Sequence, residues 1–315
     1  MEPKVAVIGT VFIDCKGFAR QRYNPFGRNL GNVKFLHGGV GRNVAENLAY
    51  LNLPIYFVST VDNSALGNEV INRLRKANVN LDFVSFAKDK GMGMWLAVLD
   101  QKGDLVGSIS QMPDLSLLER LVSEKGQDVI KRSSHVVLEL DLNECISRKV
   151  IEIAQKFNKQ IYGIPGNLEV VMNNRDLLCY TECFICNDIE AGRLLGTDLS
   201  GMDIKELLDI LIRFVIEAGL PSMVITLGAR GSVYFDSRTR EKGYQPTFQT
   251  KVIDSSGAGD AFFSGTVTKL IRNSPLSEAV TYGTKVASWT IQVEENTCSD
   301  IPVKIREESV SKVAG

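Results

Sequence analysis

The stretch D-S-S-G-A-G-D-A-F-F-S-G, residues 254–265, places two glycines around one alanine and then delivers a single acid, Asp260. Residues 251–253 end an extended stretch and the pattern over 258–272 is helical, so the glycines are predicted to lie at a helix N-terminus. Free backbone N–H groups and the helix dipole form an anion site there, and glycine lets the backbone approach the anion closely. The sequence therefore predicts an anion-binding turn over residues 257–259.

Asp260 is the unusual member of this motif, because a phosphate-binding loop normally carries basic residues. The Gly-Lys-Ser/Thr ending of a P-loop is missing, which excludes a lysine-assisted cradle in this stretch. An acid in the first turn of a helix can be only a cap. A carboxylate beside an anion site can also accept the proton of a hydroxyl that attacks phosphorus. We favour this catalytic interpretation because a second glycine cluster agrees with it.

That second cluster is H-G-G-V-G-R-N, residues 37–43, at a predicted strand-to-helix junction. It does not fit a dinucleotide fingerprint, because the first strand-to-helix turn of the chain has no glycine cluster. Bare Gly38 and Gly39 would let a polyhydroxyl ligand lie against the backbone, and Asn43 can donate and accept hydrogen bonds. Asp14 is an acceptor suited to vicinal hydroxyls, although a lone loop aspartate is more commonly exposed to solvent.

A third motif, V-I-T-L-G-A-R-G-S-V-Y-F at residues 224–235, predicts a strand, a tight turn and a second strand. It places Thr226, Gly228 and Gly231 at one end of a sheet. Taken alone, the pattern is equally typical of a simple hairpin and of a ligand-binding turn.

A fourth motif, N-D-I-E-A-G-R-L-L-G at residues 187–196, follows a predicted strand directly. Asn187 and Glu190 are three residues apart and share one helix face. Glu190 can be a capping-box member, or it can orient magnesium-bound water near phosphates, since magnesium keeps several waters.

Strands and helices alternate along most of the chain, which predicts a mainly parallel sheet covered on both faces. Such sheets bind ligands at the carboxyl ends of their strands. The predicted strands are Val5–Val11, Ile55–Val61, His135–Leu140, Gln160–Ile164, Glu182–Cys186 and Met223–Leu227, and the predicted helices cover 41–52, 67–77, 144–157, 203–218, 258–272 and 276–292.

Two early segments interrupt this alternation. Residues 92–110 predict a β-hairpin with a Gly-Asp turn, and residues 16–36 are aromatic and basic without helical periodicity. They indicate a β lid over the binding edge, with ordinary surface insertions as the alternative. Because no linker or repeat is found, we expect one domain over residues 1–315, with a lid formed approximately by residues 12–36 and 85–112.

Composition excludes several classes of protein. A content of 44% hydrophobic and 23% charged residues is that of a globular chain, so general disorder is not expected. Thirty-six basic and 37 acidic residues argue against a nucleic-acid partner held by bulk charge. No apolar run approaches the roughly 20 residues that span a bilayer, and the N-terminus lacks the form of a signal peptide. We expect a cytoplasmic protein that has neither a nucleic-acid nor a membrane partner.

Three of the six cysteines, Cys179, Cys183 and Cys186, have a Cys-x3-Cys-x2-Cys spacing that can hold an iron–sulfur cluster. The alternative is that Cys183 and Cys186 belong to a buried strand, where cysteine behaves as a small hydrophobe. No further ligand candidates flank the three, so we favour the buried strand.

The four motifs, in this order, resemble those of the PfkB, or ribokinase-like, family of carbohydrate and nucleoside kinases, over essentially the whole chain. The family's D-T-x-G-A-G-D-x-F pattern is similar to residues 254–262, and its double glycine followed by asparagine is similar to residues 38–43. Its N-x-x-E motif matches Asn187 and Glu190, and its T-x-G-x-x-G segment matches residues 226–231. The resemblance implies an α/β three-layer sandwich with a mainly parallel central sheet and a small β lid.

The resemblance also implies ATP-dependent phosphorylation of a hydroxyl on a sugar or nucleoside. Asp260 would be the base, with Gly257, Ala258 and Gly259 as the anion hole for the γ-phosphate. Substrate binding would fall to Asp14, Gly38, Gly39, Asn43, Glu139 and Asp141, nucleotide binding to Asn187, Thr226, Gly228 and Gly231, water-mediated magnesium binding to Glu190, and potassium binding to Asp254 and Ser256 with backbone from 294–299. In several members the lid also pairs subunits, which implies a homodimer.

Three segments look more like pseudouridine kinases than like ribokinase or phosphofructokinase. They are G-G-V-G-R-N-V-A-E-N-L-A at 38–49, W-L-A-V-L-D-Q-K-G-D-L at 95–105 and E-E-N-T at 294–297. Pseudouridine is therefore the substrate that the resemblance favours, with ribose, fructose or a similar sugar as alternatives. A non-catalytic sensor of sugars or nucleotides on the same scaffold is a third hypothesis, against which the retained Asp260 argues.

Overall fold

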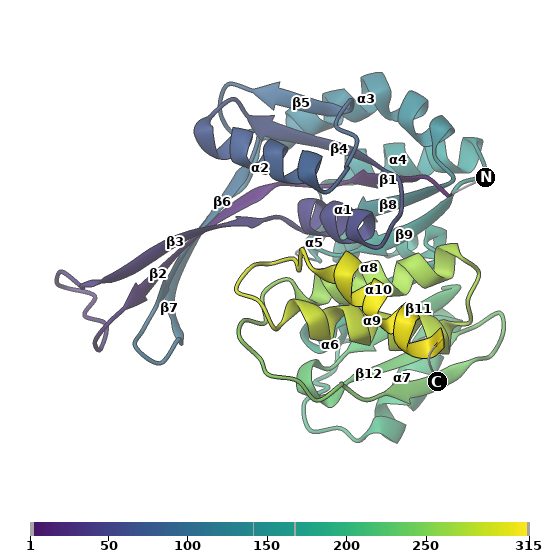
Figure 1. Ribbon diagram of the computed structural model, residues 1–315. Coiled ribbons are helices and arrows are strands. Elements are labelled where there is room, and N and C mark those ends of the chain that lie inside the picture. The colour runs from purple at the N-terminus through teal and green to yellow at the C-terminus, as the bar shows by residue number, and fades with distance from the viewer. Residues whose placement is uncertain (1–2, 141, 167, 314–315) are drawn as a thin grey trace.

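A nine-stranded sheet forms the centre of the computed structural model, which describes residues 3–140, 142–166 and 168–313 (Figure 1). The strands are parallel except at one edge, where β12 pairs antiparallel with both β11 and β13. In spatial order they are β13 (Lys242–Gln245), β12 (Ser232–Asp236), β11 (Ser222–Thr226), β10 (Cys183–Asn187), β9 (Gln160–Ile164), β8 (His135–Glu139), β1 (Val5–Ile8), β4 (Ile55–Asp62) and β5 (Val84–Ala87).

Helices cover both faces of this sheet because successive strand residues point to opposite faces. Ala6 and Ile8 of β1 belong to one hydrophobic cluster, and Val5 and Val7 belong to the other. The first cluster packs against α3 (Leu115–Arg132), α4 (Glu144–Lys156), α5 (Glu169–Asn173), α6 (Asp188–Leu195) and α7 (Ile204–Glu217), and the second against α1 (Val40–Tyr50), α2 (Ala65–Lys76), α8 (Ala258–Ile271) and α9 (Leu276–Thr290).

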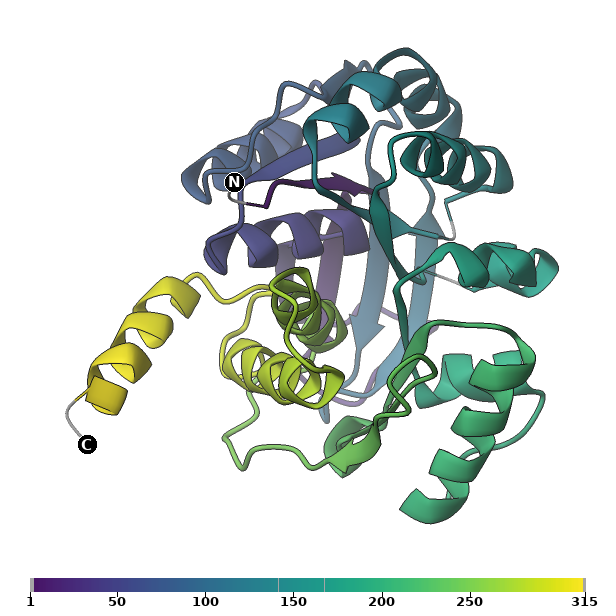
Figure 2. The same cartoon turned by 90° about the vertical axis from the view of Figure 1, so that its right-hand side faces the viewer.

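Figure 2 shows the two helical layers from the side, with the purple α1 and the yellow-green α8 and α9 on one side of the strands. The remaining helical elements of the described residues are two 3-10 helices, Arg175–Tyr180 and Gly228–Arg230, and α10 (Ile301–Val313). The predicted three-layer α/β sandwich is confirmed. No helix in the described part of the chain combines the length and the apolar character needed to cross a membrane.

Some elements differ from those predicted. The first strand ends at Ile8 and not at Val11, and residues 251–253 form no strand. Helix α3 is missing from the sequence prediction, although Asp114 caps it and accepts a hydrogen bond from Ser116 N. Its buried residues, such as Leu118 and Val129, pack against strands that the sequence could not show to be adjacent.

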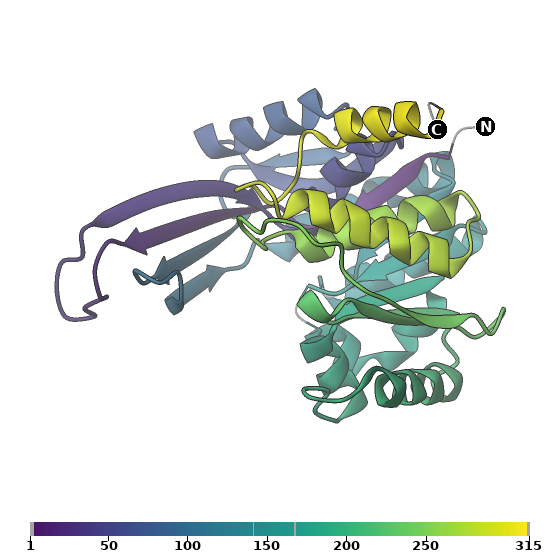
Figure 3. The same ribbon diagram turned by 60° about the horizontal axis from the view of Figure 1, so that its bottom comes forward.

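A second sheet of four strands projects from the body of the molecule (Figures 1 and 3). Its spatial order is β3 (Gly31–Gly38), β2 (Phe12–Ala19), β6 (Gly93–Leu99) and β7 (Leu105–Gln111). These strands come from the two segments that interrupt the alternation, whereas residues 84–87 form β5 and belong to the main sheet. We call this four-stranded element the small sheet.

The three cysteines considered for an iron–sulfur cluster do not converge. Cys183 and Cys186 lie on β10 and pack into opposite hydrophobic clusters, one on each face of the main sheet, while Cys179 is exposed. Burial raises the pKa of the Cys183 thiol to about 12, so it stays protonated. Among the described residues no group of three or more His, Cys, Asp or Glu side chains could hold a metal ion. The cluster hypothesis is therefore wrong.

Candidate active site

The predicted anion-binding turn lies at the start of α8. Gly257 is the N-cap residue with φ of 74°, and the helix begins at Ala258. A Cβ on Gly257 would stand 2.0 Å from the backbone oxygen of Asn296, so a side chain has no room there. At Gly259, by contrast, no atom lies within 4 Å of the Cβ position. The turn therefore places backbone N–H groups at a helix N-terminus, with open space beside Gly259, as an anion site requires.

Asp260 lies in the first turn of α8 and faces α1. Its Oδ2 accepts a hydrogen bond of 2.7 Å from Nδ2 of Asn43. Burial raises the pKa of Asp260 to about 7, and the charge of Glu139 adds to the rise, while the hydrogen bond from Asn43 opposes it. A carboxyl group with a pKa near neutrality can hold and release a proton at physiological pH. The structure thus brings together Asp260 and Asn43, which are 217 residues apart.

Arg42 holds Asn43 in this orientation. The guanidinium of Arg42 is fully buried and donates hydrogen bonds to Oδ1 of Asn43 and to the carboxylate of Glu46. Because the amide oxygen of Asn43 is taken by Arg42, its NH2 group is turned toward Asp260. Sequence reasoning missed Arg42 because a charged residue on a helix is normally exposed, and only the fold shows that it is buried.

Glu46 is the centre of a buried ionic network. It accepts hydrogen bonds from Arg42, Arg73, Tyr50 and Thr297, and the last of these ties α1 to the segment that follows α9. Burial alone would raise the pKa of Glu46, but the charges of Arg42 and Arg73 outweigh it and lower that pKa. Glu46 is therefore ionised, and the network fixes the helix that carries Asn43.

Asp14 lies on β2 and is buried, so the expectation of an exposed loop aspartate does not hold. Its Oδ2 accepts a hydrogen bond of 2.9 Å from Nδ2 of Asn296. Burial raises the pKa of Asp14, against the effects of Asn296 and Lys16. A Cβ on Gly38 would stand 2.5 Å from Oδ1 of Asp14, so the carboxylate leaves no room for a side chain at position 38. Asn296 is a second residue that sequence reasoning had not assigned to the substrate.

Glu139 is buried at the end of β8 and contacts the backbone of the loop after β1 and of the start of α1. Its Oε2 accepts hydrogen bonds from the backbone N–H groups of Thr10, at 2.8 Å, and Gly41, at 3.3 Å. These contacts hold the start of α1 against the loop after β1. Gly39, just before α1, has a φ of 93° that only glycine adopts easily. Asp141, the other acid predicted near this strand, lies outside the described residues.

Two neighbouring cavities meet at the start of α8. The larger has a volume of about 790 Å³ and is lined by the predicted nucleotide residues together with apolar side chains: Asn187, Thr226, Gly228, Gly231, Phe248, Val252 and Ile291 are among them. The smaller, of about 190 Å³, is lined by Asp260 and Glu190. Asn187, Thr226 and Gly259 line both cavities. The anion-binding turn therefore lies between a large apolar cavity and the carboxylate of Asp260.

Thr226, Gly228 and Gly231 belong to a β-hairpin, as the simpler interpretation of their motif held, and they also line the larger cavity. Asn187 and Glu190 form a reciprocal capping box on α6, with both hydrogen bonds at 2.8 Å. The carboxylate of Glu190 nevertheless lines the smaller cavity beside Asp260. Two carboxylates facing one cavity are a donor set that fits a magnesium ion bound largely through water.

Lys16, on β2 of the small sheet, contacts the turn before α8. Its ammonium donates hydrogen bonds to Oγ of Ser256, at 2.8 Å, and to Oδ2 of Asp254, at 3.4 Å. Burial would raise the pKa of Asp254, but hydrogen bonds from Ser256 and the charge of Lys16 outweigh it and lower that pKa. These two residues are the predicted potassium ligands, and their contact with a lysine was not foreseen.

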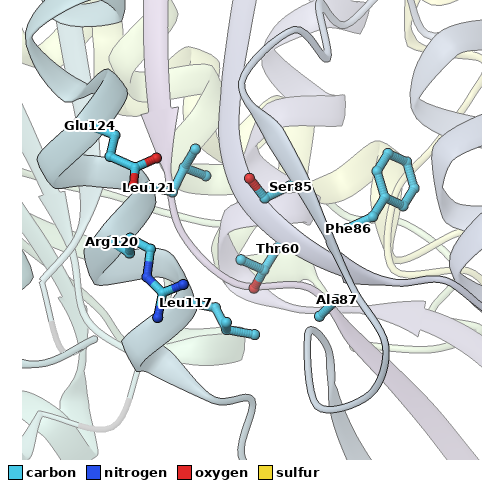
Figure 4. Close-up of a pocket in the computed structure, with 8 residues that line it drawn as sticks. All are labelled: Thr60, Ser85, Phe86, Ala87, Leu117, Arg120, Leu121 and Glu124. Carbon is cyan, nitrogen blue, oxygen red and sulfur yellow. The ribbon is translucent and has the colours of Figure 1, made fainter.

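A further cavity of about 200 Å³ lies between α3 and the ends of β4 and β5 (Figure 4). Thr60, Ser85 and Arg120 line it, and none of its residues lines the two cavities near Asp260. It is therefore separate from the candidate active site.

Comparison with known proteins identifies the family of this chain. The model of the pfkB family of carbohydrate kinases matches residues 2–303. This chain belongs to the PfkB family. It is a sugar or nucleoside kinase.

Individual PfkB relatives differ in their substrates. The chain is 38% identical to the guanosine-inosine kinase of Exiguobacterium acetylicum over 293 residues, which cover 93% of this chain and 96% of that protein. It is 25% identical to the pseudouridine kinase of Escherichia coli over 95% of this chain and 94% of that one. Among solved structures, Arabidopsis thaliana ribokinase complexed with ribose and ATP has a TM-score of 0.80 at 19% identity, covering 97% and 99% of the two chains.

Proposed function

We propose that this PfkB kinase transfers the γ-phosphoryl group of ATP to a hydroxyl of a nucleoside. The observation that carries the proposal is Asp260, a carboxyl group with a pKa near 7 in the first turn of α8, which lines the smaller cavity next to the anion-binding turn. A helix N-terminus stabilises the transferred charge, and a carboxylate beside it removes the proton that the attacking oxygen must lose.

In the proposed reaction Asp260 takes the proton of the substrate hydroxyl as that oxygen forms its bond to the γ-phosphorus. The bond between the γ-phosphorus and the bridging oxygen breaks, and ADP leaves with the electron pair. The backbone N–H groups of residues 257–259 receive the charge on the equatorial oxygens. Asn43 and Arg42 keep the Asp260 carboxylate directed toward the smaller cavity.

The larger cavity suits ATP because its wall combines apolar side chains with backbone at Gly228 and Gly231. Glu190 would hold magnesium through water, and the metal would supply positive charge to the phosphates. The Arabidopsis ribokinase complexed with ATP has the same fold, which supports this assignment.

A nucleoside rather than a free sugar is favoured by Trp95. In the small sheet Trp95 pairs in register with Asp14, so both side chains project from the same face. Trp95 is partly exposed there. An aromatic ring beside the carboxylate that would hold the ribose hydroxyls offers a stacking surface for the base.

Guanosine or inosine is the first candidate substrate, because the guanosine-inosine kinase is the more similar of the two nucleoside kinases compared. Pseudouridine, which the sequence motifs favour, is the second. Ribose and fructose are the sugar alternatives.

A panel of these five acceptors with MgATP tests the proposal, with ADP and phosphorylated product separated by chromatography. We expect the highest kcat/KM with guanosine or inosine. Trp95→Ala should then raise KM for the nucleoside about 5- to 150-fold, the worth of one to three kcal/mol of stacking, with less effect on kcat. Phe86→Ala, which removes an exposed aromatic ring away from this site, should leave both constants unchanged.

The panel also separates the proposal from a sensor. If the acceptors shift the melting temperature but none yields a phosphorylated product, the kinase proposal fails and the sensor hypothesis replaces it. If ribose is the best acceptor and Trp95→Ala changes nothing, only the assignment of a nucleoside fails.

We also propose that the small sheet joins two copies of the chain. The face opposite Asp14 carries a row of side chains, Phe35, Cys15, Leu96 and Ile109, one from each strand. Phe35 and Ile109 are 58% and 68% exposed, and apolar surface of this kind is typical of an interface. Ile109→Asp should convert a dimer to a monomer in sedimentation velocity, and Ser108→Asp, on the other face, should not. A monomeric unmodified protein would contradict this proposal.

A further inference from the structure

Lys16 is one of the few buried cationic side chains in the described part of the chain, with a relative exposure of 5%. Buried lysines are rare and require partners. Its partners are the carboxylate of Asp254 and the hydroxyl of Ser256, both on the turn that leads into the anion-binding residues 257–259. A positive charge is thus built into the wall of the phosphoryl-transfer site by a residue of the small sheet.

The same two residues are those that the family resemblance gives as ligands of a monovalent cation. Potassium would need their oxygen atoms, but the ammonium of Lys16 already lies within hydrogen-bonding distance of both. An ammonium group has donors only and the same charge as potassium, so it repels a second cation at this part-buried site. The residues present therefore do not fit a potassium ion.

We propose that the ammonium of Lys16 replaces the monovalent cation, so that this kinase turns over without potassium. The proposal rests on the assignment of residues 257–259 as the anion hole. The charge of Lys16 stabilises the turn in which Oδ1 of Asp254 accepts a 2.8 Å hydrogen bond from Ser256 N. A fixed turn places the N–H groups of the next three residues without help from a dissolved ion.

The contact of Lys16 with the turn before α8 also links this turn to the small sheet. Lys16 belongs to β2 of the small sheet, and Asp14 on the same face of that strand is held by Asn296. One strand therefore contributes both a predicted substrate ligand and the cation for the anion-binding turn. A freely exchanging ion would stabilise the turn alone, whereas Lys16 also ties the turn to the small sheet.

The first experiment uses the unmodified protein and the best acceptor of the panel. Turnover is measured in potassium chloride, ammonium chloride and tetramethylammonium chloride at equal ionic strength, with ADP separated chromatographically so that no cation-dependent coupling enzyme is present. We expect kcat/KM to agree within about twofold in the three salts. A drop of tenfold or more in tetramethylammonium would overturn the proposal without any variant being needed.

The second experiment removes the built-in cation. Lys16→Ala should lose about tenfold or more of kcat/KM in tetramethylammonium, as expected when charge stabilisation of the transferred group is lost, and should recover part of it in potassium or ammonium. Lys34→Ala is the matched control, because Lys34 pairs with Lys16 across the strands but contacts Glu294 instead. Lys34→Ala should behave like the unmodified protein in all three salts.

The outcomes are distinct. Full activity of Lys16→Ala in tetramethylammonium would contradict the need for the charge, and loss without recovery in any salt would leave Lys16 as a structural anchor and overturn the replacement of the cation. If Lys16→Ala does not fold, as judged by its melting curve, the salt series on the unmodified protein decides. Failure of the proposed kinase function would appear differently, as absence of phosphorylated product in every salt.

Discussion

The two halves of the candidate active site are built in different ways. The phosphoryl half is one continuous segment, residues 254–260, whose conformation depends on a glycine N-cap and the start of α8. The substrate half is assembled from strand β2, helix α1 and the segment around Asn296, which are far apart in the chain. The first half uses backbone N–H groups, and the second uses buried side chains. The comparison teaches that the conformation of an anion-binding turn is encoded locally, although Lys16 and Asn296 pack against it from elsewhere in the chain, whereas a pocket for a polar substrate needs the whole fold.

The energetic requirements of the two halves differ accordingly. Backbone amides at a helix N-terminus carry no net charge and need no partner when the ligand is absent. The substrate half must bury Arg42 and Glu46, and removing either partner of such a pair leaves an uncompensated charge that costs about 3–5 kcal/mol. The ionic network therefore positions Asn43, and other interactions of the fold must offset the cost of burying its charges.

The largest expected effect concerns the residue at which the two halves meet. Asp260→Asn should lower kcat about 10²–10⁴-fold, because the amide cannot take the proton of the attacking hydroxyl. Binding of ATP should survive, since the backbone of the turn is unchanged. Turnover by ADP release and affinity by calorimetry are the measurements, and full activity would refute the role of Asp260 as the base.

A stability measurement excludes misfolding of this variant. With its pKa raised from 3.8 to about 7, Asp260 keeps its proton in the folded state where the unfolded chain has lost it. The contribution of Asp260 to stability therefore falls as pH rises between these values and is not recovered above pH 7. Asp260→Asn should melt higher than the unmodified protein at pH 8, and the difference should shrink toward pH 5.

The second prediction concerns the phosphoryl half alone. Gly257→Ala should lower kcat at least about tenfold and destabilise the fold by about 1–3 kcal/mol, since a positive φ is strained for alanine and its Cβ would meet the Asn296 backbone. Gly259→Ala is the control for stability, because its Cβ position is open. Equal melting temperatures for the two variants would show that the turn is less constrained than its geometry indicates.

The smallest expected effect is on the pH dependence of activity, and it tests the hydrogen bond between Asn43 and Asp260. A base must be deprotonated, so kcat/KM of the unmodified protein should rise with pH through the pKa of Asp260, near 7. Asn43→Ala removes a hydrogen bond that lowers this pKa, so its profile should shift to higher pH. The loss of activity should be greater at pH 6.5 than at pH 9. An unshifted profile would mean that Asn43 binds substrate without affecting the base.

Much of the architecture could be predicted from the sequence. Five of the six predicted strands match a structural strand to within about two residues at each end, because buried parallel strands are short apolar runs with clear limits. Helix α3 was missed, and its partners β4 and β5 are neighbours only in the folded chain. The small sheet was expected as a lid, but its strand order, which places Lys16 and Trp95 on the face of Asp14, follows from tertiary pairing alone.

The sequence by itself determined the parts of this protein that depend on local backbone conformation: the glycine turn before α8, the capping box at Asn187 and the alternation that makes the α/β sandwich. Only the tertiary structure decided which distant side chains meet, namely Asn43 with Asp260, Asn296 with Asp14, and Lys16 with Ser256. The physical reason is that a turn or cap is fixed by residues a few positions apart, whereas burial and charge pairing depend on which strands and helices become neighbours.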